Sequence, residues 1–208
     1  MKAHSTKLKS LVLRRIRAAG MNWSTFSNSA NQIIVYGSYA LSANTRTSDL
    51  DILCIGDGNR YKSSKLHIVW ISEQRTCSKQ WLGSELATHV ATHGVWIKGS
   101  NNWAHLTKPS RAAIKRKKNN ILSRLNAMQR HWDKLHPRFQ TGQLTKLRQD
   151  LQRYQMMRRG QAPLPKTLLD AEWRQYKNPD GWAVLLVKSS PLTRLIRKFL
   201  LEKKISSP

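Results

Sequence analysis

The sequence predicts a small α/β domain followed by a basic helical region. Apolar runs of strand length, separated by glycine-containing turns, occur only in the first half of the chain, at about residues 20–108. Beyond Pro109 the apolar positions recur at helical spacing among many lysines and arginines. The chain of 208 residues is long enough to bury a core. We therefore expect two domains, residues 1–108 and residues 109–208.

The first domain alternates predicted helices and strands. Residues 5–19 carry apolar side chains at helical spacing, and Gly20 is placed to end that helix. Three apolar runs of strand length follow, at residues 31–38, 49–55 and 65–72. Next comes a predicted helix in "GSELATHVATHG", with Ser84 as its N-cap and Gly94 as its C-cap.

The second domain is predicted to be helical throughout. A long basic helix should begin after Ser110, which can cap it, and should stop near Pro137. Further helical segments are expected at about residues 143–159, 166–177 and 191–204.

Positive charge is concentrated in the second half of the chain. Lysine and arginine number 37 against 11 acidic residues, which gives a formal charge of +26. Residues 1–100 hold 13 basic and 5 acidic residues (+8), and residues 101–208 hold 24 and 6 (+18). Such a charge favours a polyanion, most simply nucleic acid, as partner. The candidate nucleic-acid-binding residues are Lys115, Arg116, Lys117, Lys118, Arg158 and Arg159.

Cysteine use and hydropathy predict a cytoplasmic protein. Cys54 and Cys77 have no paired spacing that would indicate disulfides. Arginines interrupt the apolar residues of the N-terminal segment, so it lacks the apolar core of a signal peptide. No run approaches the roughly 20 apolar residues that a membrane span needs, so we expect no membrane partner.

Two of the few acidic residues, Asp49 and Asp51, lie one residue apart in a predicted strand. Because side chains alternate along a strand, both carboxylates leave the same face and can converge on a divalent metal. Gly37 and Ser38 precede them in a tight turn, whose amides and hydroxyl can hold phosphate oxygens that the same metal bridges. The pattern predicts a Mg²⁺ and phosphate site.

These residues carry a resemblance to a known family. A Gly-Ser pair, ten residues, and then Asp-x-Asp between apolar positions resembles the polymerase-β-type nucleotidyltransferase superfamily, over about residues 30–100. Ser48 and Ala40 match positions that are common in its minimal members. The resemblance implies a mixed sheet with helices on one side, and thus an α+β chain with a basic helical C-terminal region. It also implies Mg²⁺, or alternatively Mn²⁺, as cofactor, an NTP as substrate and pyrophosphate as product.

The resemblance also implies residue roles. Gly37 and Ser38 would hold the triphosphate, together with Ser48 beside the metal site, while Asp49 and Asp51 would bind the metals. Arg46 lies in the loop between the turn and the carboxylates, where a guanidinium can neutralise phosphate charge.

One position departs from the family pattern. The family supplies a third carboxylate from a later strand, and His67 stands in that place. Histidine can accept a proton but is a poor Mg²⁺ ligand. The predicted catalytic set is therefore Asp49, Asp51 and His67. Glu73, at the same strand parity as His67, is an alternative third carboxylate.

Three functions remain open on the sequence. The favoured one is Mg²⁺-dependent transfer of a nucleoside monophosphate from an NTP to RNA, for example tRNA. The second is transfer to a protein hydroxyl, as in members related to toxin-antitoxin systems. The third is an inactive head on a nucleic-acid-binding protein. The sequence selects neither the nucleotide, ATP or another NTP, nor the oligomeric state.

Overall fold

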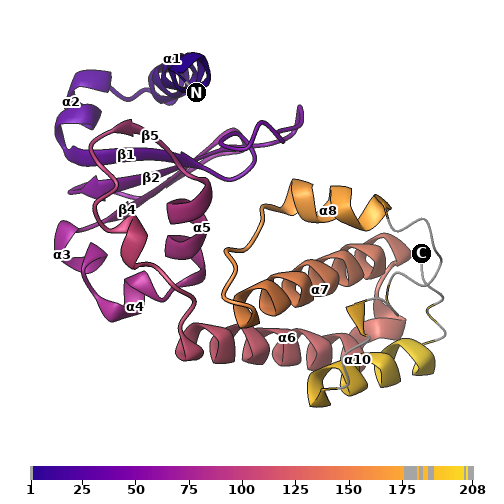
Figure 1. Cartoon of the computed structure of the whole chain (residues 1–208). Helices are drawn as coiled ribbons and strands as arrows, with labels where there is room; N and C mark the ends of the chain where they lie inside the picture. The colour runs from indigo at the N-terminus through magenta and orange to yellow at the C-terminus, as the bar shows by residue number, and fades with distance from the viewer. Residues whose placement is uncertain (1, 176–181, 183–184, 187–189, 204, 206–208) are drawn as a thin grey trace. The chain divides into compact units, whose positions relative to one another are not determined.

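The computed structural model of the chain describes residues 2–175, 182, 185–186, 190–203 and 205. It divides into two compact units (Figure 1). The first comprises Met1–Ser110 and Ala162–Thr167, and the second comprises Arg111–Gln161 and Leu168–Pro208.

The first unit is built around a five-stranded mixed sheet with the strand order β3-β4-β2-β1-β5. Its strands are β1 (Ala30–Tyr36), β2 (Leu50–Gly56), β3 (Tyr61–Lys62), β4 (Leu66–Ile71) and β5 (Val95–Lys98). The β2 and β4 strands are parallel, whereas the other neighbouring pairs are antiparallel. The predicted mixed-sheet α+β fold is confirmed.

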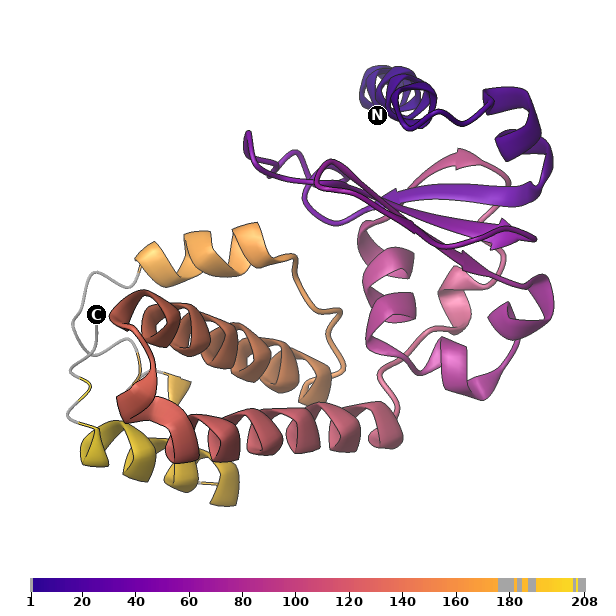
Figure 2. The same ribbon diagram turned by 180° about the vertical axis from the view of Figure 1, so that it is seen from behind.

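Helices cover both faces of this sheet, which differs from the expected arrangement with helices on one side (Figure 2). Ile33 and Val35 of β1 pack in one core, whereas Ile34 and Tyr36 pack in the other. The physical reason is that β1 and β2 are almost continuously apolar, as strands buried on both faces are. On the first face lie α1 (Lys2–Ala18) and α2 (Trp23–Asn28); on the second lie α4 (Lys79–Leu82), α5 (Glu85–His93) and η1 (Ala104–Leu106).

Local signals placed α5 correctly. Ser84 is its N-cap and accepts a hydrogen bond from the backbone N–H of Ala87 through its side chain, and Gly94 is its C-cap. Between β4 and α4 the short helix α3 (Glu73–Thr76) begins directly after Ser72. Strand β4 has therefore ended before it reaches Glu73.

The second unit is helical. It contains α6 (Arg111–His131), η2 (Trp132–Lys134), α7 (Pro137–Arg158), α8 (Lys166–Gln175, of which Lys166 and Thr167 belong to the first unit) and α10 (Pro191–Glu202). The expected stop near Pro137 is in fact the first turn of α7, where proline is well tolerated because that N–H needs no helical partner. Apolar side chains of α6, α7 and α10 form its core. None of the described helices combines the length and apolar character that crossing a membrane requires.

A buried arginine links two helices of this unit. Arg148 of α7 is only 4% exposed, and its guanidinium donates to the carboxylate of Asp170 and to the Leu169 carbonyl in α8. Its Cζ also lies 4.7 Å from the centre of the Trp173 ring. A buried charge needs such partners because desolvation without them is costly.

Candidate active site

The turn after β1 lies against the carboxylate on β2. Tyr36, the last residue of β1, is paired in register with Asp51. Gly37 follows with φ +75°, and a Cβ built on it would lie 2.7 Å from Asp51 Oδ2. A glycine is therefore required here for two reasons, the left-handed backbone and the close approach of the carboxylate. The structure brings the predicted turn and the predicted carboxylate together.

Asp49 and Asp51 form a pair of neighbouring acids. Asp49 lies just before β2 and Asp51 is the second residue of the strand. Burial, and next the negative charge of Asp49, raise the pKa of Asp51 to about 6, against a lowering influence of His67 and Lys62. Burial and the same two carboxylates raise the pKa of Tyr36 as well. Negative charge thus accumulates at this end of the sheet.

His67 contacts Asp51 directly. The parallel register of β2 and β4 sets the two residues opposite each other, with His67 Nδ1 3.1 Å from Asp51 Oδ1. On the other side of the ring, Arg60 Nη2 lies 3.2 Å from Nε2. A guanidinium can only donate, so Nε2 accepts, and Nδ1 carries the proton that it donates to Asp51.

This geometry bears on the predicted role of His67 as a proton acceptor. A general base needs a free lone pair within hydrogen-bond reach of the acceptor hydroxyl. In the structure the Nε2 lone pair accepts from Arg60 and Nδ1 donates to Asp51, so the role of His67 as a proton acceptor stays a prediction. Glu73 does not replace the missing carboxylate, because its Oε2 accepts from Asn31 Nδ2, next to the start of β1 and far along the sheet from Asp51.

The loop between the turn and the carboxylates holds the other predicted nucleotide-binding residues. Ser38 is half-buried, and its carbonyl accepts from the Ala43 N–H. The Ser48 hydroxyl accepts from the Thr45 N–H at 2.9 Å, so it closes the loop on itself. Arg46 is exposed at the loop surface.

The residues present fit a magnesium ion held by two carboxylates. Among the residues that the structure describes, no group of three or more His, Cys, Asp and Glu side chains is placed to hold a metal. Mg²⁺, however, is commonly held by one or two protein carboxylates together with substrate phosphates and water. A divalent cation between Asp49 and Asp51 would also offset the repulsion that raises the pKa of Asp51.

Two cations near the site, Arg60 and Lys62, lie outside the predicted set of residues. Arg60 precedes β3 and Lys62 ends it, and Lys62 is paired in register with His67. Each approaches the acids only because the short β3 strand pairs back on β4. No local pattern marks them, although a basic residue in a short turn before an apolar strand is a weak signal of a hairpin.

The predicted nucleic-acid-binding residues in the second unit are not all exposed. Lys115, Arg116, Arg158 and Arg159 are exposed, and Lys118 is half-exposed. Lys117 points inward, is 9% exposed, and donates to Asp150 at 2.9 Å. The structure therefore does not favour Lys117 as a phosphate ligand.

Comparisons with known proteins place this site in a family. Residues 24–124 match the model of the nucleotidyltransferase domain. Two solved structures are similar at low identity. A nucleotidyltransferase-like protein from Exiguobacterium sibiricum 255-15 is 16% identical, with 94% of this chain and 77% of that chain covered and a TM-score of 0.38. A toxin-antitoxin structure with AMP-PNP is 14% identical, with 58% and 95% covered and a TM-score of 0.27.

Similarity at that level does not indicate a shared activity or partner. No curated protein matches the chain. The family match includes the Gly37–Ser38 turn, both aspartates and His67. Residues 24–124 are therefore a nucleotidyltransferase domain.

Proposed function

We propose that the protein is a magnesium-dependent nucleotidyltransferase that transfers a nucleoside monophosphate from an NTP to a hydroxyl of RNA. Pyrophosphate is the leaving group. The observation that carries the proposal is the close approach of Gly37 to Asp51, which sets the Gly37–Ser38 turn directly against a pair of neighbouring carboxylates.

Each group of this chain has a defined part in that reaction. Asp49 and Asp51 would hold Mg²⁺, which would supply positive charge to offset the negative charge of the triphosphate. The backbone after Gly37 and the Ser38 hydroxyl orient the phosphates. His67 holds the Asp51 carboxylate in place through Nδ1. Arg60 and Lys62 add positive charge at the same end of the sheet.

RNA is proposed as acceptor on the basis of charge. Residues 101–208 carry an excess of 18 positive charges, and several of these side chains are exposed on α6 and α7. Phosphate contacts from such side chains dominate the affinity of proteins for nucleic acid.

Labelling tests the proposal. The full chain is incubated with Mg²⁺, total cellular RNA and protein, and one α-³²P-labelled NTP at a time. Transfer of label to RNA is the expected result, and it should vanish in EDTA. Label on protein instead would overturn RNA as the acceptor while leaving nucleotidyl transfer intact. No labelled macromolecule with any NTP would overturn the activity itself.

One observation favours a second candidate function, in which the first domain has no transferase activity. The position of the third family carboxylate holds His67, and Arg60 places a guanidinium beside it. A site with fewer carboxylates binds divalent metal less tightly.

The variant His67→Asp separates the two candidates, because it restores a carboxylate at the position that faces Asp51. Activity that appears only in His67→Asp would support an inactive natural head. Activity in the unmodified chain that falls in His67→Asp would support a role for histidine in an active enzyme. Binding of Mn²⁺ measured by calorimetry gives a readout that does not depend on activity.

A further inference from the structure

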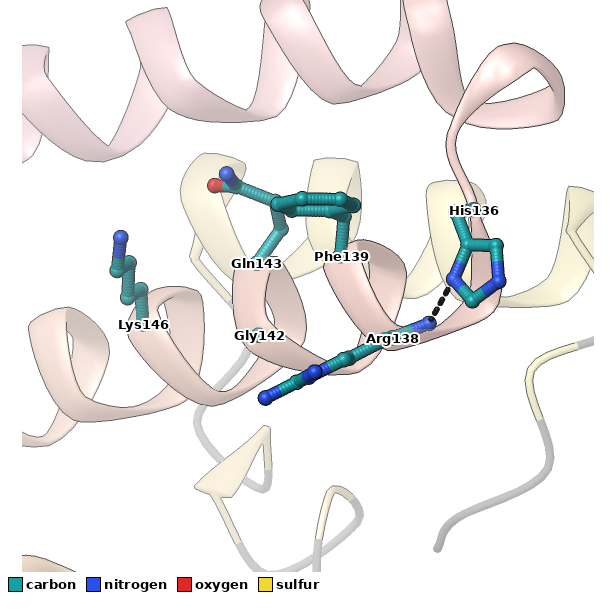
Figure 3. A pocket seen from close by; sticks show the side chains of 6 residues that line it. All are labelled: His136, Arg138, Phe139, Gly142, Gln143 and Lys146. Atoms are coloured by element: carbon teal, nitrogen blue, oxygen red, sulfur yellow. Dashed lines mark hydrogen bonds between the residues drawn. The ribbon is translucent and has the colours of Figure 1, made fainter.

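An exposed phenylalanine stands in a basic hollow on α7 of the second unit. The hollow has a volume of about 600 Å³ and is lined by His136, Arg138, Phe139, Gly142, Gln143 and Lys146 (Figure 3). The Phe139 side chain is 65% exposed, although large apolar residues usually pack inward. Its position is not explained by the buried core of the unit, to which α7 contributes Leu147 and Leu151 but not Phe139.

The lining residues share one side of the helix. Phe139, Gln143 and Lys146 are spaced by four and three residues, so their side chains lie above one another along α7 (Figure 3). Gly142 adds no side chain, and a Cβ built there would meet nothing within 4 Å. A glycine inside a helix costs about 1 kcal/mol relative to alanine. Its presence leaves the floor of the hollow open beside the ring.

The charge of the hollow selects the kind of ligand. Arg138 and Lys146 are exposed, and none of the residues that line the hollow is acidic. The acids that the structure describes in the second unit include Asp150 and Asp170, which are already paired with lysine or arginine. Gln143 also lines a second hollow of about 610 Å³ between α6 and α7, whose lining includes the paired Asp150.

From these features we propose that the hollow binds single-stranded nucleic acid, with a base stacked on Phe139 and the adjacent phosphates held by Arg138 and Lys146. Exposed aromatic rings between cations bind single strands in this way, because every base offers a flat face and every link carries a charge. A duplex does not fit, since its bases are already stacked on one another. The proposal rests on the proposed function in one respect: this surface would hold the RNA acceptor.

Fluorescence anisotropy with the full chain tests it, without NTP or Mg²⁺. The probe is a short unstructured single-stranded RNA, compared with a duplex of the same sequence. Phe139→Ala should weaken single-strand binding about fivefold or more, the loss typical of one stacked base, and should leave duplex binding unchanged. Phe139→Trp should retain or improve it. A loss in Phe139→Ala that Trp does not restore, or equal loss for the duplex, would overturn stacking.

The charges are tested separately by salt dependence. Lys146→Gln should lower the slope of log affinity against log salt by about 0.7, the value for one phosphate contact on a single strand. Lys9→Gln removes the same charge from an exposed side chain of α1, in the other unit, and should leave the slope unchanged. Equal slopes for both variants and the unmodified chain would overturn the phosphate contact.

Gly142 offers a steric test. Gly142→Gln and Gly142→Glu both fill the hollow with side chains of equal size, and both should reduce single-strand binding, Glu more strongly. Gly142→Ala, which adds one methyl group in open space, should keep the fold and most of the affinity. Unaltered binding in all three would overturn the site.

Two further outcomes would also overturn it. If the unmodified chain binds no single-stranded RNA, the hollow has another ligand. If Phe139→Ala leaves RNA affinity unchanged but dissociates an oligomer in sedimentation, the exposed ring serves self-association. Neither result bears on nucleotidyl transfer itself, because the labelling experiment measures the activity of the first unit independently.

Discussion

The aspartates of the two units are used in opposite ways. In the second unit, Asp133, Asp150 and Asp170 each form an ion pair with a lysine or arginine. In the first unit, Asp49 and Asp51 stand beside each other, and within the described part of the chain neither forms such a pair. In a chain with so many cations this difference is informative.

Paired and unpaired acids affect the stability of the fold in different ways. An acid that neutralises a buried cation stabilises the fold, and removing it exposes the cost of the unpaired charge. Two acids that repel each other on one face lower stability instead, and such groups are concentrated at functional sites. The first unit therefore retains an unfavourable arrangement that a bound cation would offset. In the second unit, Asp133, Asp150 and Asp170 are instead paired with cations of the same unit.

The largest effect is expected from the unpaired acids. Asp51→Asn and Asp49→Asn should each lower nucleotidyl transfer at least about 100-fold, because each removes a charge that offsets the charge developing on the substrate. Neither should lower the melting temperature, since each removes repulsion. Transfer of label from NTP and thermal unfolding are the measurements.

The matched control is Asp57→Asn. Asp57 is exposed and follows the opposite end of β2, so the same substitution there should leave transfer unchanged. Full activity in both Asp49→Asn and Asp51→Asn would contradict the metal site and remove the contrast between the units.

The second effect concerns a paired acid. Asp170→Ala should destabilise the second unit by about 3 kcal/mol, because it leaves the buried Arg148 guanidinium without its carboxylate. Asp133→Ala breaks a pair whose carboxylate is 76% exposed and should cost less than about 1 kcal/mol. Urea unfolding followed by circular dichroism measures both. Equal losses would show that burial does not decide the value of these pairs.

Local patterns predicted the parts of the site that depend on nearby residues. The Gly37–Ser38 turn, the alternation that sets Asp49 and Asp51 on one face, and the cap at Ser84 are all properties of a few consecutive residues. The burial of Lys117 also had a signal, because it falls in the same four-residue stripe as Ile121 and Leu125.

Contacts that depend on strand pairing have no local signal in the sequence. The register that sets His67 against Asp51 arises from β2 and β4, which a crossover separates in sequence, and only the family resemblance assigned His67 to the site. Arg60 reaches His67 only through the two-residue strand β3, which is too short to show a pattern. Helices on both sheet faces follow from packing across the whole unit.

The third effect concerns the close approach of the Gly37 turn to the Asp51 carboxylate. Gly37→Ala should lower the rate of transfer by about 100-fold, because the new Cβ would displace the Asp51 carboxylate. The control is Gly20→Ala, at φ +77° with nothing within 4 Å of a Cβ. Both variants should lower the unfolding free energy by about 1–2 kcal/mol, because alanine is strained in a left-handed backbone conformation. Equal loss of transfer in both would show that backbone strain, and not contact with Asp51, is responsible.

The smallest effect concerns Arg60, which acts on Asp51 only through His67. Arg60→Gln should lower kcat/KM about tenfold, the lower end of what residues behind a metal ligand contribute. Its stability should be unchanged within about 0.5 kcal/mol, because the side chain is exposed. Arg75→Gln, an exposed arginine on α3 at the other end of the sheet, is the control and should have full activity.

The double variant shows by which route Arg60 acts. If Arg60 fixes the His67 ring, it has nothing to hold once the ring is gone, so Arg60→Gln with His67→Asn should lose no more activity than His67→Asn alone. If Arg60 instead contacts phosphate directly, the two losses should multiply, and Arg60→Lys should recover most of the activity because the charge remains. Steady-state kinetics of the unmodified chain, the two single variants and the double variant decide between these routes. Arg60 either orients Asp51 through His67 or acts on the substrate directly.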